Sequence, residues 1–329
     1  MTLTSHVTRK QSGGSPPGHD QAAVPVKVLI TGATGFAGRW LIAELDAAGH
    51  IAVPAPRGAD DDMWNVAIIR DLLDRTQPDA VAHLAAVSFG PDAAADPGLA
   101  FRTNVGGTQA LIEALRTMDR RISLLVTGSS EVYGLSDPAS LPLREDSPLM
   151  ATAPYGLSKL AQEAVAVEGA VRYGIPTAVS RAFNHTGPGQ RPEFAAPAFA
   201  RRVLDVRHGR AATVRAGNVD VRRDLGDVRD VVVAYRLLLE LLNDLEVGSP
   251  IVANVATGRS VSMREVIRDL SSLAGIEAPI EVDSSLVRDG EPLEIRGDAS
   301  LLQRLTGWEP RRGLAETLKD LLDDASIRK

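Results

Sequence analysis

An apolar run followed at once by regularly spaced glycines constrains the fold of this 329-residue chain more than any other feature. Residues 26–30 read Val-Lys-Val-Leu-Ile, and after Thr31 the glycines follow at intervals of three, at Gly32, Gly35 and Gly38. A short apolar run that ends in glycine indicates a buried strand of a parallel sheet. Residues 39–48 then carry apolar side chains at helical spacing. The segment therefore predicts a strand, a tight turn and a helix, in that order.

Strand-like and helix-like segments alternate along most of the remaining chain. Further strands are expected near residues 51–53, 80–86, 122–127, 177–181 and 251–255. Helices are expected near residues 64–75, 104–118 and 227–242, and around Tyr155 and Lys159. This alternation predicts an α/β fold built on a doubly wound parallel sheet.

Composition narrows the class of protein. The hydrophobic share of 44% and the charged share of 24% are those of an ordinary soluble protein. The chain has no cysteine, which rules out disulfides, a thiolate nucleophile and a cysteine-ligated zinc, and we expect no metal site. The net charge of −6 argues against nucleic acid as a partner. No apolar run is long enough to span a bilayer, and residues 1–24 are expected to form a disordered tail rather than a signal peptide.

The glycine turn suits a dinucleotide. Glycines allow a tight turn and a close approach of the backbone, so that amide groups at the start of the following helix can bind a pyrophosphate. The candidate cofactor-binding residues of this turn are Gly32, Thr34, Gly35, Phe36 and Gly38.

Tyr155 and Lys159 are the candidate chemical pair. Residues four apart share one face of a helix, so the phenol and the ammonium can be neighbours. A nearby ammonium favours the charged form of a phenol whose pKa is ordinarily about 10, which lets the tyrosine act as an acid or base near neutral pH. A solvated helical pair is the alternative.

The glycine spacing together with Tyr155 and Lys159 resembles the extended, nucleotide-sugar branch of the short-chain dehydrogenase/reductase superfamily, from Lys27 to the C-terminal helix. This resemblance implies a Rossmann fold with a smaller mixed α/β C-terminal substrate domain. It assigns residues 25–182 and 224–256 to a dinucleotide-binding domain and residues 183–223 and 257–329 to a discontinuous substrate-binding domain.

The resemblance also implies site residues. In Gly128–Gly134 it makes Ser129 a catalytic hydrogen-bond donor, with Ser130 as the adjacent competitor and loop or capping hydrogen bonds as the alternative for both. Glu131 holds the place of a catalytic base in sugar dehydratases, and a structural role is equally open. Asn104 would support the active site or cap a helix. Tyr155 and Lys159 would also bind the cofactor, together with Asp62, Met63, Leu84, Ala85, Ala86 and Thr127. His83 is expected to be a hydrogen-bonded strand residue.

The second strand bears on the choice of cofactor. An enzyme that uses NAD normally has an acid at the end of this strand to bind the adenosine ribose. Here the stretch reads Val-Pro-Ala-Pro-Arg at residues 53–57, with Arg57 just beyond. We therefore expect NADPH to be preferred, while the acids at residues 60–62 leave NADH possible.

A sharper resemblance covers residues 181–190, 217–224 and 227–230. These segments are similar to GDP-4-keto-6-deoxy-D-mannose reductases, which form GDP-D-rhamnose. The resemblance implies that a GDP-sugar is bound by Ser88, Ser130, Glu131, Asn184, Arg223 and Arg288. The family usually has proline after the last arginine, but Asp289 follows here, and Asp289 and Glu291 would repel a diphosphate.

The sequence therefore predicts a cytoplasmic, homodimeric oxidoreductase that reduces the C4 ketone of GDP-4-keto-6-deoxy-D-mannose. A GDP-mannose 4,6-dehydratase and a nucleotide-sugar epimerase are alternatives of the same fold. A regulatory protein that senses nicotinamide without turnover is an alternative of another class.

Overall fold

The computed structural model describes residues 24–56, 65–135, 137–244, 249–287 and 290–327. The chain forms two compact units. The first contains the chain up to Gly128 together with Ala153–Arg181 and Val232–Ala253. The second contains Ser129–Thr152, Ala182–Val231 and the chain from Asn254. The assignment of cofactor and substrate to separate domains, with the boundaries given above, stays a prediction.

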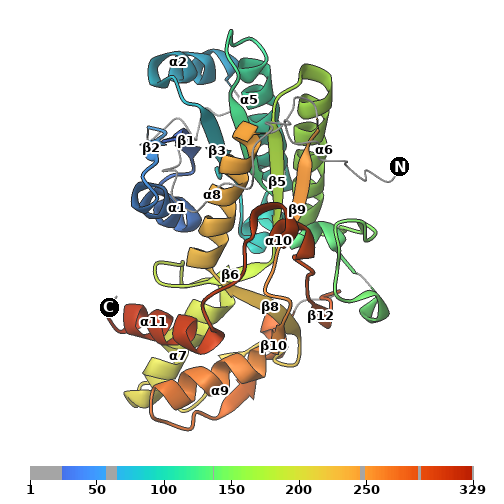
Figure 1. The fold of residues 1–329 in the computed structure, drawn as a ribbon. Coiled ribbons are helices and arrows are strands. Elements are labelled where there is room, and N and C mark those ends of the chain that lie inside the picture. Colours follow the sequence, from blue (N-terminus) through green and yellow to red (C-terminus); the bar gives the residue numbers. More distant parts are fainter. Residues whose placement is uncertain (1–23, 57–64, 136, 245–248, 288–289, 328–329) are drawn as a thin grey trace. The chain divides into compact units, whose positions relative to one another are not determined.

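The first unit is built on a six-stranded sheet (Figure 1). Its strand order is β2 (Ile51–Pro54), β1 (Lys27–Thr31), β3 (Ala80–His83), β4 (Ser123–Thr127), β5 (Thr177–Ala182) and β9 (Ile251–Val255). The pairs β1–β2, β1–β3, β3–β4 and β4–β5 are parallel. The structure thus confirms the doubly wound parallel sheet.

The order of the strands predicts where a ligand binds. The chain passes from β1 to β2 on one side and returns to β3 on the other, so the carboxyl ends of β1 and β3 lie at the point where the strand order reverses. Ligands of open α/β sheets bind at such points. The glycine turn follows β1 and residues 84–86 follow β3.

Helices cover both faces of this sheet (Figure 1). On one face α2 (Val66–Thr76), α5 (Gly107–Leu115) and α6 (Pro154–Tyr173) share a buried core with the strands that includes Leu72, Leu111, Leu124, Ala166 and Val179. The helices α3 (Gly90–Ala95) and α4 (Pro97–Phe101) and a π-helical turn, η1 (Arg102–Gly106), lead into α5. On α8 (Val228–Asp244), Arg236 binds Glu44 of α1 (Phe36–Ala47) at 2.7 Å.

The second unit contains smaller sheets. Strand β8 (Arg222–Asp227) pairs with β6 (Asn184–Thr186), β10 (Ser260–Ser262) and β12 (Glu294–Ile295), and β7 (Val214–Ala216) pairs with β11 (Ile280–Val282). The helices α7 (Ala195–Arg207), α9 (Met263–Leu273) and α11 (Leu314–Ile327) share a second core that includes Phe199, Val203, Ile267, Leu270 and Leu318. A short helix, α10 (Ser300–Thr306), and single turns η2 (Ser130–Tyr133), η3 (Pro138–Ser140) and η4 (Ser284–Leu286) complete the unit.

Several expected elements have different bounds in the structure, and the helix expected near residues 104–118 is α5 preceded by the π-helical turn η1. The first helix begins at Phe36 rather than near residue 39, because Gly35 is its N-cap and Gly38 lies inside it. Strand β3 ends at His83 rather than at residue 86, because the chain turns there against the glycine turn. None of the described helices is both long enough and apolar enough to cross a bilayer.

Candidate active site

The glycine turn is shaped by close backbone contacts. Gly32 has a φ of +68°, and a Cβ on it would lie 2.6 Å from the amide nitrogen of Ala85. A Cβ on Gly38 would lie 2.3 Å from the carbonyl oxygen of Gly32. Both positions therefore require glycine, and Gly35, the N-cap of α1, offers no side-chain capping group. This cradle fits a dinucleotide pyrophosphate.

Lys159 is buried on α6. Its side chain is held by two acceptors, the carbonyl oxygen of Thr127 and Oε1 of Gln162, each 2.8 Å from Nζ. Burial lowers the pKa of Lys159 to about 7, because a buried ammonium loses its hydration. Half-buried Tyr155 lies one turn earlier on the same helix.

His83, at the end of β3, is neutral. Its Nδ1 lies 2.8 Å from Oγ1 of Thr31, and Thr127 donates to its carbonyl oxygen at 3.2 Å. Burial, and after it the positive charge of Lys159, lower the pKa of His83 to about 3. His83 is thus the hydrogen-bonded strand residue expected from the sequence.

Asn104 is fully buried in η1, and its side chain is hydrogen-bonded to the segment after β3 and to α6. Its Oδ1 accepts from the amide of Val87 at 2.8 Å, and its Nδ2 donates to Oγ of Ser158 at 2.9 Å. Because it lies inside a helical stretch and its side chain binds distant residues, Asn104 is not a helix N-cap. The neighbouring Ser88 is exposed.

In the second unit, Ser129 caps the turn η2. Its Oγ accepts from the amide of Glu131 at 3.1 Å, and its side chain is almost completely buried. The capping hydrogen bond expected as the alternative to a catalytic role is therefore present. Because Ser129 only accepts in this bond, its hydroxyl proton can still be donated to another group. Ser130 is buried, whereas Glu131 is exposed.

Arg223 and Arg222 point to different partners. Arg223 donates to Glu291 at 2.6 Å and to the carbonyl oxygen of Pro292 at 2.9 Å. Arg222 binds Glu265 at 3.0 Å and the carbonyl oxygen of Ser260 at 2.9 Å. Glu291, expected to repel a diphosphate, is thus the ion-pair partner of Arg223.

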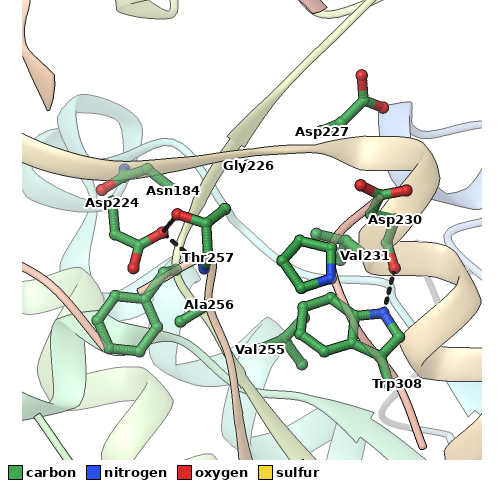
Figure 2. A pocket seen from close by; sticks show the side chains of 12 residues that line it. Asn184, Asp224, Gly226, Asp227, Asp230, Val231, Val255, Ala256, Thr257 and Trp308 are labelled. Carbon is green, nitrogen blue, oxygen red and sulfur yellow. Dashed lines mark hydrogen bonds between the residues drawn. The ribbon is translucent and has the colours of Figure 1, made fainter. Parts of the chain in front are cut away.

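The residue after Arg223, Asp224, is fully buried and lies beside Thr257 (Figure 2), and no role was predicted for it from the sequence. Asp224 accepts hydrogen bonds from the amides of Thr257, Gly258 and Gly297 and from the Thr257 hydroxyl, at 2.7 to 3.2 Å. Burial raises its pKa. The adjoining cavity, also lined by Asn184, has a volume of about 10 Å³, which suits one water and not a sugar nucleotide.

The remaining residues predicted for the site lie in several places. Leu84, Ala85 and Ala86 follow β3 beside the glycine turn, and Asn184 is exposed at the start of β6. Arg57, Asp62, Met63, Arg288 and Asp289 lie outside the described residues. Among the residues that the structure describes, no three His, Asp or Glu side chains gather as a metal ion would require.

Comparison with known proteins identifies the family. A family model described as GDP-mannose 4,6 dehydratase matches residues 57–321. A GDP-6-deoxy-D-mannose reductase of Pseudomonas aeruginosa is 34% identical over 303 residues, which are 92% of this chain and 98% of that protein. The chain belongs to the extended short-chain dehydrogenase/reductase family.

A solved structure that is similar to this chain has the same fold, and an epimerase is related in sequence. A solved structure of RMD from Pseudomonas aeruginosa, complexed with NADPH, is 33% identical, superposes with a TM-score of 0.83, and is matched over 92% of this chain and 100% of that one. A UDP-glucose 4-epimerase of Azospirillum brasilense is 27% identical over 89% of each chain. As an extended short-chain dehydrogenase/reductase, the chain is an enzyme.

Proposed function

We propose that this enzyme reduces the C4 ketone of GDP-4-keto-6-deoxy-D-mannose, with NADPH preferred and NADH possible. The observation that carries the proposal is the pair of Tyr155 and buried Lys159 on α6, in a chain similar over nearly its whole length to a GDP-6-deoxy-D-mannose reductase. A ketone reduction needs a proton donor for the developing alkoxide, and Tyr155 supplies one.

Three side chains have separate roles in the proposed reduction. Tyr155 donates its phenolic proton to the C4 oxygen, and the ammonium of Lys159 stabilises the phenolate that remains. Lys159 also binds the nicotinamide ribose. Ser129 keeps its hydroxyl proton available while its oxygen accepts from Glu131, so it can donate to the carbonyl oxygen.

The cofactor is held by the glycine turn and the segment after β3. The residues that would hold it are Gly32, Thr34, Gly35, Phe36, Gly38, Leu84, Ala85, Ala86 and Thr127, with Asp62 and Met63 beside the adenine. When bound, NADPH supplies the hydride that C4 receives. Arg57 would meet the 2′-phosphate, which favours NADPH over NADH.

The substrate residues are Ser88, Ser130, Glu131, Asn184, Arg223 and Arg288. Guanidinium groups match phosphate oxygens in a bidentate geometry, so Arg223 is the candidate for the diphosphate. A diphosphate there has to replace or join the carboxylate of Glu291.

We further propose a cytoplasmic homodimer formed through α5 and α6. Their outer surface has a groove lined by Gln109, Glu113, Ala164, Val165, Glu168, Arg172 and Tyr173. The mix of small apolar residues and charges suits a second copy of the same helix pair.

The decisive assay uses a panel of nucleoside-diphosphate 4-keto sugars. A reductase consumes one NADPH per product, and NMR gives the configuration at C4. A GDP-mannose 4,6-dehydratase would instead act on GDP-mannose without net consumption of the cofactor, and an epimerase would only invert a hydroxyl group. Turnover of GDP-mannose, with no use of 4-keto sugars, would overturn the reductase proposal.

A further inference from the structure

Gln162, one turn beyond Lys159 on α6, belongs to no motif but makes one of the two hydrogen bonds that hold the lysine. Its side chain is 1% exposed. Its Oε1 lies 2.8 Å from Nζ of Lys159, and its Nε2 lies 2.9 Å from Oγ1 of Thr108 on α5. The carbonyl end and the NH₂ end of this buried amide are thus both hydrogen-bonded, which indicates a specific polar contact rather than simple core packing.

The hydrogen bonds beyond Gln162 fix the direction of its amide. Thr108 donates its hydroxyl proton to the carbonyl oxygen of Asn104 at 2.8 Å. The hydroxyl oxygen can therefore only accept from Gln162, so the NH₂ end of the amide must face Thr108 and the carbonyl end must face Lys159. A flipped amide would set an NH₂ group against the ammonium.

The same network reaches the backbone of Tyr155. Asn104 donates to Ser158 at 2.9 Å, and Ser158 donates to the carbonyl oxygen of Tyr155 at 2.7 Å. Gln162 is thus one end of a buried chain of polar groups that runs from the lysine through α5 and η1 back to the first turn of α6.

An ammonium has three N–H groups, and two of those on Lys159 are directed at neutral oxygens. We propose that Gln162 is a positioning residue, which with the Thr127 carbonyl fixes the Lys159 ammonium so that its third N–H is presented to the ligand. This inference rests on the proposed reduction, in which Lys159 assists Tyr155.

The charges around Lys159 determine how its pKa should change when Gln162 is replaced. His83 on β3 is neutral, and Tyr155 lies one turn earlier on α6. Glu163, the next residue on α6, has both oxygens bound by Arg181 of β5 at 2.6 and 2.9 Å. A carboxylate at position 162 would therefore be a new negative charge beside the ammonium, whereas an apolar side chain would remove an acceptor.

The test compares Gln162→Met and Gln162→Glu with the wild type and with Gln303→Met, an exposed glutamine on α10. The chain has only five lysines, so the Lys159 ammonium can be titrated by NMR with ¹⁵N-labelled lysine. Gln162→Met should lower the pKa of Lys159 and Gln162→Glu should raise it, each by about one unit. The alkaline limb of the turnover profile should move in the same two directions, and Gln303→Met should change neither.

A purely structural role would lower thermal stability without these opposite shifts. An unchanged Lys159 titration in two folded variants overturns the proposal, and so does a shifted titration with an unmoved turnover profile. If one variant does not fold, Thr108→Val, which removes the partner that orients the amide, should move both readouts in the direction of Gln162→Met. Failure of the reductase proposal is seen separately, as absence of turnover in the wild type, because the NMR titration needs no substrate.

Discussion

Arg223 and Glu291 form an ion pair in which Nη2 of the arginine lies 2.6 Å from Oε1 of the glutamate. The arginine side chain is 11% exposed and that of the glutamate 24%. Arg223 also donates to the carbonyl oxygens of Arg222 and Pro292. The protein itself therefore orients the guanidinium, with a carboxylate in the place where we propose that a phosphate binds.

Arg223→Ala should raise the KM for the sugar nucleotide about ten- to hundredfold, because a charge-assisted hydrogen bond is worth about 1.5–3 kcal/mol. The KM for NADPH should change little, since the lost contact involves one ligand only. Arg222→Ala is the matched control, because Arg222 is directed at Glu265 and Ser260. Equal effects of the two substitutions, or equal effects on both ligands, would make Arg223 a structural residue.

The buried lysine should make stability depend on pH. The pKa of Lys159 is about 7 in the folded protein and near 10.5 when the lysine is solvated. Between these values the unfolded chain binds a proton that the folded protein does not, so this group makes the free energy of unfolding rise with pH. Lys159→Met removes that contribution. Thermal unfolding from pH 7 to 10 should show the wild type gaining stability relative to the variant, and a constant difference would contradict the depressed pKa.

Because the backbone contacts in the glycine turn are close, adding a Cβ to a glycine there should lower the stability of the protein. Gly38→Ala places a Cβ 2.3 Å from the backbone oxygen of Gly32, which should destabilise the protein by about 1–3 kcal/mol and weaken NADPH binding. Gly106→Ala is the control, because Gly106 has helical dihedral angles and a Cβ added to it would meet no atom within 4 Å. That substitution should stabilise by about 0.5–1 kcal/mol. Calorimetry and cofactor titration of both variants would separate the two effects.

The dimer is tested at the groove between α5 and α6. Ala164 is exposed there, and Ala164→Glu adds a charge that two facing copies would have to bury. Light scattering should show a dimer for the wild type at micromolar concentration and a monomer for the variant. Ala211→Glu, at an exposed alanine of the second unit, should remain dimeric. A monomeric wild type would remove the homodimer from the proposal.

The sheet and the glycine turn could be predicted from the sequence because each depends on residues that are close together in the chain. The glycine spacing led directly to the contacts of Gly32 and Gly38, and the strands were found from their apolar runs. Helix α7 was missed because its N-cap, Phe194, makes no capping bond and its first turn contains Pro197. Gln162 and Asp224 were missed for another reason, since their partners Thr108 and Thr257 are distant in sequence and only the fold brings them together. The spacing of Gln162 from Lys159 was the one available signal.

Following an isotope from the cofactor to the sugar tests the proposed reduction most directly. With NADPH that carries deuterium at the transferred position, and GDP-4-keto-6-deoxy-D-mannose as substrate, we expect one label at C4 of the product for each NADPH consumed. Tyr155→Phe should bind NADPH as tightly but lose about 10²–10⁴-fold in turnover, because it has no phenolic proton to donate. Label found elsewhere, cofactor recovered unconsumed, or near-normal turnover by Tyr155→Phe would contradict the account.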